Sequence, residues 1–440
     1  MGCSIGPMGG KDATSREHTL PPGIAAQLAA EGGRVPFARF MELALTHPDD
    51  GYYARVDRLL GHRGDFTTVP RRSPVFNRAV ARLLTDLVDV ALSERPREDR
   101  VPGDRLPEDS LPVIELGAGE GDLASAILSE WDAKRPDLMD AVVYSVVEIG
   151  EELKRKQASL LGWLTGRGWR VYWQARLATP AVRPAWGAKA RSAIVFGNEF
   201  VDALPVHLVD VRGLVAREAW VRVAESPGSV TASTGNDPGR GSTERYQAAE
   251  EWGELSAPAA EELRALFGSV DVAALRSLTR DGIIELRPAA KGLLVDAASV
   301  AREVCLLTVD YGDWFAGTHD AGACGAACGL PPALRGRSVR GYFKHQLASD
   351  PYERVGSQDL TADVDFAALD LHGRELGFET VLFATVAGFL TAAGGGEELE
   401  RLRGEAAGSL DADREAAMLA ALLDPDDVGG VFKVMLQVKE

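Results

Sequence analysis

Short apolar runs alternate with amphipathic stretches through the middle of the chain. Uniformly apolar short runs predict buried strands, and apolar residues spaced three or four apart predict helices. Strands are predicted at 111–116, 141–149, 169–173 and 192–200, with helices between them at 123–131 and 151–164. Strands that alternate with helices at this spacing indicate right-handed βαβ units and a parallel sheet.

Both flanks of this region carry patterns of the same two kinds. Helices are predicted at 35–47, 73–92, 288–302 and 365–377, and strands at 304–312, 378–386 and 431–439. Residues 206–212 and 214–223 are typical of paired strands near a sheet edge, whereas 226–243 and 315–332 have loop composition. We therefore predict an α/β fold, a doubly wound sheet with an N-terminal helical cap and inserted segments in its second half.

The first residues bear on domain organisation and location. The segment MGCSIGPMGGKDATSREHTLPPG lacks the apolar core of a secretory signal and the Arg-rich pattern of a transit peptide. We expect a disordered leader (1–34), a helical cap with a charged linker (35–110) and a main domain (111–440) with insertions at about 206–300 and 313–365. Without a targeting signal, a cytoplasmic location is expected.

The charge balance narrows the function classes. The 440 residues include 48 Lys and Arg against 65 Asp and Glu, a net charge of −17. Nucleic acids and anionic membranes reward clustered cations, so neither is expected as a partner. No apolar run is long enough for a transmembrane helix. Cys324 and Cys328 have no neighbouring Cys or His pair to complete a zinc site, so no metal is expected.

The sharpest chemical signal is the segment VIELGAGEGDL, which lies between a predicted strand and a predicted helix. Gly117, Gly119 and Gly121 can adopt positive φ and let the backbone approach a ligand closely. A dinucleotide fingerprint would place its third glycine where Asp122 stands. With Glu115, the pattern E-x-G-x-G-x-G resembles that of S-adenosyl-L-methionine methyltransferases. The alternative is a merely flexible turn.

Two further strand ends carry polar side chains. Glu148 ends the next strand and can accept both hydroxyl protons of a ribose. Asn198 and Glu199 end a later strand, and Asp202 follows within one turn. Ligands bind at the carboxyl ends of parallel strands, so Asn198 is predicted to hold the donor's amino group, with a hydrogen bond from an amine acceptor as the alternative. Glu199 and Asp202 are predicted to orient a cationic acceptor. Ordinary solvated acids are the alternative.

These motifs belong to a longer series. The chain resembles the MidA-type methyltransferases, whose mitochondrial members are arginine methyltransferases that assist assembly of respiratory complex I. The matching segments are PFARFMELALTHPDDGYY, GDFTT, IELGAGEGDL, VVEI, NEFVDALPV, VDYG, GYFKH, GSQDLTADVDF and FKV, in order between Pro36 and Lys433. The resemblance implies a Rossmann-like class I methyltransferase fold, S-adenosyl-L-methionine as cofactor and N-methylation of a protein arginine.

The chain also departs from this family. The family usually has Pro and Arg at positions 118 and 120, His where Asp363 stands, an acidic residue where Arg71 stands, and an acid two positions after Trp173. Arg71 and Asp363 lie in segments expected to border the substrate. These departures leave methyl-transfer chemistry intact and put the arginine substrate in question.

Four other residues are candidates for the site. Asp65 and Phe66 follow a glycine ahead of the sheet, as expected for a lid over the donor, and Asp65 is counted with the catalytic carboxylates. Tyr311 ends a predicted strand on the ligand side, and His345 lies in GYFKH. Both are expected to bound the substrate pocket, and structural roles are the alternative for each.

Three interpretations remain open. The first is a protein-arginine N-methyltransferase that aligns an acceptor for in-line displacement at the methyl carbon. The second is a small-molecule O- or N-methyltransferase of secondary metabolism. The third is a non-catalytic assembly factor that binds the donor. The expected partner is thus a protein with an accessible arginine or a small acceptor, and a homodimer stays open.

Overall fold

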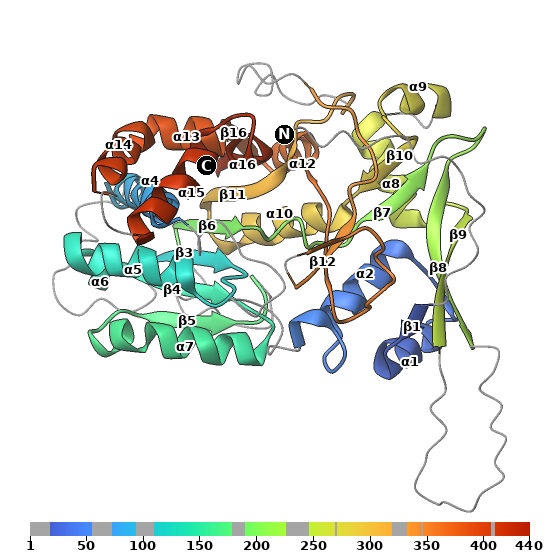
Figure 1. Cartoon of the computed structure of the whole chain (residues 1–440), viewed down its shortest axis with the longest axis horizontal. Helices are drawn as coiled ribbons and strands as arrows, with labels where there is room; N and C mark the ends of the chain where they lie inside the picture. Colours follow the sequence, from blue (N-terminus) through green and yellow to red (C-terminus); the bar gives the residue numbers. More distant parts are fainter. Residues whose placement is uncertain are drawn as a thin grey trace, which may run out of the picture.

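An eight-stranded sheet forms the centre of the larger unit (Figure 1). The computed structural model describes residues 18–54, 73–93, 110–177, 190–225, 246–268, 271–318, 332–344, 346–405 and 410–440. The strand order is β16-β17-β11-β6-β3-β4-β5, with β15 paired to β11. Strands β5, β4, β3, β6 and β11 are parallel, whereas β17 runs antiparallel between β11 and β16. The strands are β3 (Leu111–Leu116), β4 (Val142–Val147), β5 (Val171–Gln174), β6 (Ser192–Asn198), β11 (Glu303–Asp313), β15 (Val364–Asp365), β16 (Phe378–Thr385) and β17 (Phe432–Lys439).

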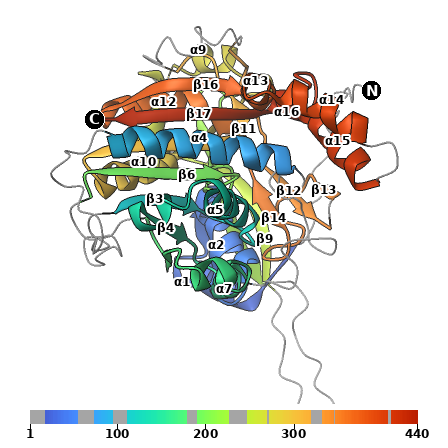
Figure 2. The same ribbon diagram turned by 90° about the vertical axis from the view of Figure 1, so that its left-hand side faces the viewer.

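Helices cover both faces of this sheet. One face packs against α4 (Pro74–Ser93), α5 (Asp122–Lys134), α7 (Glu151–Gly166), α13 (Val386–Ala392), α14 (Gly395–Glu405) and α15 (Leu410–Leu423). The other face packs against α10 (Pro288–Val300) and α12 (Phe366–Glu375). Figure 2 views the molecule from the side on which α4 and α5 lie in front of the strands. The short helices α6 (Leu138–Ala141) and α16 (Val428–Val431) precede β4 and β17.

A smaller unit is built on a six-stranded antiparallel sheet, seen on the right of Figure 1. Its order is β1-β9-β8-β7-β10, with β2 paired to β8. The strands are β1 (His18–Leu20), β2 (Arg34–Pro36), β7 (His207–Asp210), β8 (Arg217–Glu225), β9 (Tyr246–Gly253) and β10 (Ile283–Leu286). The helices are α1 (Pro22–Ala30), α2 (Phe37–Thr46), α8 (Ala257–Phe267), α9 (Val272–Ser277) and the single turn η1 (Tyr52–Ala54). A small sheet of β12 (Arg340–Phe343), β13 (Gln346–Ala348) and β14 (Asp359–Thr361) lies beside it.

The predicted mixed α/β fold is confirmed, and the elements of the large sheet lie within a few residues of their predicted bounds. The expectation of a disordered leader over 1–34 is wrong for its second half. Residues 18–20 and 34–36 are strands, and Ile24 and Leu28 of α1 are fully buried. The strands that pair with residues 18–20 and 34–36 lie about 200 residues later in the chain. The local composition of the first 36 residues therefore gives no sign of this pairing.

The segments at 206–212 and 214–223 do pair, as β7 and β8, and they lie in the second sheet, where β7 is next to the edge strand β10. One other expectation is corrected by the packing of the helices. The helices α2 and α4 do not form one cap. Helix α2 packs into the core of the smaller unit, and α4 packs on the large sheet.

Among the described residues, no helix is both long enough and apolar enough to cross a membrane.

Candidate functional site

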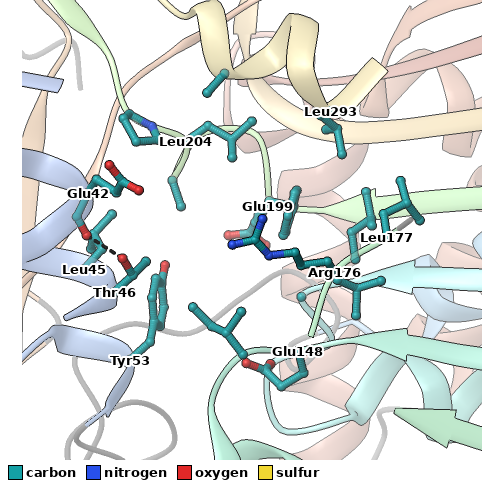
Figure 3. Close-up of a pocket in the computed structure, with 18 of the residues that line it drawn as sticks. Glu42, Leu45, Thr46, Tyr53, Glu148, Arg176, Leu177, Glu199, Leu204 and Leu293 are labelled. Atoms are coloured by element: carbon teal, nitrogen blue, oxygen red, sulfur yellow. Dashed lines mark hydrogen bonds between the residues drawn. The ribbon is translucent and has the colours of Figure 1, made fainter. Parts of the chain in front are cut away.

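A cavity of about 800 Å³ lies between the two units. Its right and lower walls in Figure 3 come from the carboxyl ends of the parallel strands, where Glu148, Arg176 and Glu199 project inward. Its left wall comes from α2 and η1, which contribute Glu42 and Tyr53. The sheet order explains the first wall, because parallel strands bring their carboxyl ends to one edge.

The glycine-rich turn between β3 and α5 has the predicted conformation. Gly117, Gly119 and Gly121 all have positive φ, at 60°, 57° and 95°. A Cβ on Gly117 would lie 2.8 Å from the ring of Phe200, too close for any side chain. The turn lines the cavity, so the backbone itself forms this part of the wall.

Glu148 is held by a hydrogen-bond network that includes Gln157 of α7. Its Oε1 accepts a hydrogen bond from Gly150 N at 2.7 Å, and its Oε2 accepts one from Gln157 Nε2 at 3.3 Å. Gln157 also donates to the carbonyl oxygen of Gly119 at 2.8 Å and accepts from Trp173 Nε1 at 2.8 Å. Burial raises the pKa of Glu148. The network ties three strand ends together around the carboxylate.

Glu115 also borders the cavity, but most of its carboxyl group lies within the sheet. It accepts a hydrogen bond from the Tyr144 hydroxyl of β4 at 2.7 Å, and only 3% of its surface is exposed. Burial raises its pKa from 4.5 to about 7. Little of the Glu115 side chain is therefore exposed to a ligand in the cavity.

Asn198 and Glu199 both line the cavity. Glu199 adopts φ of 51°, and its N–H donates to the carbonyl oxygen of Val309 at 2.9 Å. Such a conformation is strained for a residue other than glycine and persists only where the surroundings enforce it. Asn198 Nδ2 donates to Glu199 Oε1 at 3.1 Å, while the buried Oδ1 of Asn198 has no partner among the described residues.

Asp202 and Tyr311 are not among the cavity-lining residues, which corrects the expectation that they border the substrate. The Tyr311 hydroxyl donates to the Asp202 carboxylate, and both side chains are buried. The backbone N–H of Asp202 donates to Asp310 Oδ2 at 3.2 Å. Burial raises the pKa of Asp202, and Tyr311, Arg287 and Arg340 lower it. The chain turns after Glu199, so the Asp202 side chain lies behind the cavity wall and not on its surface.

Several predicted residues fall outside the part of the chain that the structure describes. They are Asp65, Phe66, Arg71, Cys324, Cys328 and His345. Within the described ranges, no group of three or more His, Cys, Asp or Glu side chains could hold a metal ion.

The wall of the cavity that the smaller unit forms, called the far wall below, was not predicted from the sequence. Glu42 and Thr46 of α2, Tyr53 of η1 and His207 of β7 line the same cavity as the glycine turn. Helix α2 was recognised as a helix, but its amphipathic pattern marks only its buried face. No local pattern tells which exposed residues face another unit. The available signal was the family resemblance, because Glu42, Thr46 and Tyr53 lie within the matching segment PFARFMELALTHPDDGYY and His207 directly follows NEFVDALPV.

The family model and the curated relatives that match this chain are all methyltransferases. The sequence model of a family described as S-adenosyl-L-methionine-dependent methyltransferases matches residues 103–384. A mitochondrial protein arginine methyltransferase NDUFAF7 homolog of Drosophila melanogaster is 26% identical over 81% of this chain and 71% of its own length. The mitochondrial NDUFAF7 protein arginine methyltransferase of Danio rerio is 26% identical over 79% of this chain and 70% of its own length.

A solved structure shares the fold. A Burkholderia thailandensis protein crystallised with S-adenosyl-homocysteine superposes with a TM-score of 0.65 at 24% identity, over 94% of this chain and 92% of that one. One expectation is contradicted by these comparisons. Both curated relatives are named as mitochondrial proteins, which conflicts with the predicted cytoplasmic location.

Proposed function

The chain belongs to the family of S-adenosyl-L-methionine-dependent methyltransferases, and on that premise we propose that it N-methylates an arginine side chain in a protein. The observation that carries the proposal is the pair of carboxylates that line opposite walls of one cavity, Glu199 at the end of β6 and Glu42 on α2 (Figure 3). A guanidinium presents several N–H donors in a fixed fork. Carboxylates on two sides can orient such a group.

Three observations support donor binding at the wall formed by the carboxyl ends of the parallel strands, called the near wall below. The cavity volume is in the range of small-molecule sites. The positive φ angles of the glycine turn allow close backbone approach. The buried, unpartnered Oδ1 of Asn198 can accept a hydrogen bond from the donor's ammonium group. We assign Glu148 to the ribose hydroxyls, because it lines the cavity directly after β4 and a carboxylate can accept both hydroxyl protons.

In this mechanism the bound donor supplies an activated methyl group on a sulfonium. The residues of the chain align the acceptor and exclude water, which is where most of the rate gain in such a displacement arises. Glu199 is fixed by Asn198 and by its own strained backbone, so it can hold an acceptor N–H in one direction. Glu42 on the opposite wall would keep the guanidinium charge balanced.

The finer structural assignments are part of the same proposal. The parallel order β5-β4-β3-β6-β11 with helices on both faces supports a Rossmann-like, doubly wound class I sheet. We further propose that the strand ends of the large sheet supply the donor site, while the segment from 18 to 54 and residues 206–286 of the insertion form the substrate-side unit.

The test is methyl transfer from labelled S-adenosyl-L-methionine into protein extract from a strain that lacks the enzyme. We expect label in the protein fraction and methylated arginine by mass spectrometry. Glu199→Gln should lower kcat much more than donor affinity, because it removes charge from the acceptor's surroundings only. Gln in place of Glu400, an exposed glutamate of α14, is the matched control and should leave both unchanged.

A second candidate is methylation of a small, largely apolar acceptor. The upper wall of the cavity is apolar and includes Leu204 and Leu293 (Figure 3). Label that enters only the small-molecule fraction of the extract would favour this candidate over the protein arginine. Donor binding without label in either fraction would indicate a donor-binding assembly factor.

A further inference from the structure

A buried histidine–glutamate pair reaches the cavity from the smaller unit. His207 begins β7, lines the cavity and has 8% of its surface exposed. Its Nδ1 lies 2.6 Å from Oε1 of Glu218, which projects from the neighbouring strand β8. Glu218 is completely buried. A carboxylate without access to water has to be satisfied by donors inside the protein.

Glu218 has two such donors. Its second oxygen, Oε2, accepts a hydrogen bond from the backbone N–H of Ser256 at 2.5 Å. Ser256 is the N-cap of α8, and the positive end of a helix dipole favours a nearby anion. Both carboxylate oxygens of Glu218 thus have a partner, and Oε1 is placed to accept a hydrogen bond from His207 Nδ1. A histidine whose Nδ1–H is held by a carboxylate has the lone pair on Nε2.

The remaining nitrogen has no competing partner on the described part of the chain, where no hydrogen bond to His207 Nε2 is found. The other charged groups on this wall are Arg39 and Glu42 of α2, and Arg39 is paired with Glu42 at 2.7 Å and with Glu31 at 2.7 Å. Nε2 of a cavity-lining histidine is thus available as a proton acceptor.

We propose that His207 accepts the proton that the methyl acceptor loses, and that Glu218 is the positioning residue that fixes the ring and its tautomer. When the acceptor nitrogen or oxygen forms its bond to the methyl carbon, the carbon–sulfur bond breaks and its electron pair stays on sulfur. The acceptor then carries one proton too many. That proton passes to His207 Nε2, and the resulting imidazolium is stabilised by Glu218 until the proton leaves to water.

The inference rests on methyl transfer to an N–H or O–H group and not on arginine as the substrate. It also divides the work between two sides of the cavity. Glu199 orients the acceptor from the β6 end, whereas His207 takes up the proton. Imidazole is a common general base in catalysis, and His207 is the histidine that lines this cavity in the described part of the chain.

The chain offers a matched control. His372 of α12 also contacts a buried glutamate, with 2.8 Å between its Nε2 and Glu262 Oε1. Neither residue lines the cavity. A purely structural role for buried His–Glu pairs would make the two histidines behave alike.

The kinetic test compares His207→Gln, Glu218→Gln, Glu218→Asp and His372→Gln. The readouts are donor affinity by calorimetry and label transfer into whichever fraction of the deletion-strain extract the wild type labels. Removing a general base lowers kcat by on the order of 100-fold, and we expect this for His207→Gln with unchanged donor affinity. Glu218→Gln should lose part of the activity and shift the acid limb of the pH–rate profile. Glu218→Asp keeps the carboxylate and should therefore keep the wild-type activity and the wild-type acid limb.

His372→Gln should retain wild-type kcat. Unchanged kcat in His207→Gln, or an equal loss in His372→Gln, overturns the proposal.

A second readout does not depend on turnover. Nitrogen NMR of protein labelled at histidine, assigned by the signals lost in His207→Gln, reports which ring nitrogen carries the proton. We expect Nδ1–H in the wild type and a mixture in Glu218→Gln. Protonation at Nε2 in the wild type at neutral pH overturns the proposal. If neither fraction of the extract takes label, the proposed function fails, and the tautomer still decides for or against the His207–Glu218 pair.

Discussion

Single residues at the glycine turn decide whether the donor can approach the backbone. Gly117→Val would place side-chain atoms against Phe200 at a position with φ of 60°. We expect lower stability without donor and no rise in Tm on adding S-adenosyl-L-methionine. In the wild type, the donor should add about 2.7 kcal/mol at 100 times its Kd. Thermal unfolding with and without donor measures both effects.

The control for this prediction is another glycine with free space around it. Gly162 lies within α7, and a Cβ there would meet nothing within 4 Å. Gly162→Ala should keep the full donor-dependent rise in Tm and add about 0.5–1 kcal/mol of stability, because alanine suits a helix interior better. A full rise in Tm for Gly117→Val would contradict the assignment of the turn to the donor.

At the scale of elements, the pairing of β3 with β4 places a carboxyl group inside the sheet. Glu115 lies against Tyr144 of β4, and burial raises its pKa from 4.5 to about 7. Between these values the folded protein holds a proton that the unfolded chain releases. Glu115 therefore adds stability that is present below about pH 4.5 and lost as the pH rises through about 7.

Glu115→Gln removes this dependence and keeps a group that can accept from Tyr144. The free energy of unfolding of the wild type should fall relative to the variant by about 3 kcal/mol between pH 4 and pH 8. Denaturant titrations across that range measure the difference. Glu400→Gln, at an exposed site on α14, should run parallel to the wild type. Parallel curves for Glu115→Gln would mean that the carboxyl group is not buried.

At the scale of the whole molecule, a net charge of −17 surrounds a cavity with acidic groups on two walls. A cationic acceptor would be attracted over a distance that shrinks as salt shortens the Debye length from about 10 Å at 0.1 M to about 3 Å at 1 M. We expect the apparent KM for the protein acceptor to rise steadily with salt. Initial rates at several salt concentrations measure it.

The comparison variant for the salt series is Glu42→Gln on α2, which should weaken the dependence on salt by removing one of the acidic groups. A KM that stays flat across the series would argue for a neutral acceptor and hence for the second candidate function.

The sequence by itself determined the large sheet and the near wall of the cavity. Strands β3 and β4 are apolar except for Glu115 and Ser145, because they are buried on both faces. The glycine turn, Glu148, Asn198 and Glu199 then follow from chain order, since each lies at or directly after the end of a strand of one parallel sheet. These are local patterns, and the parallel topology converts them into neighbours at one edge.

Only the tertiary structure decided the far wall. β1 and β2 pair with strands about 200 residues away, and α2, which follows β2, packs on this smaller sheet with Glu42 and Thr46 lining the cavity. The contact between His207 and Glu218 depends on the same antiparallel sheet. Asp202 is the opposite case. Its position after β6 predicts that it borders the cavity, but a turn of the backbone places it among buried residues away from the cavity surface. Sequence patterns record which face of an element is buried, whereas long-range packing decides which exposed side chains meet.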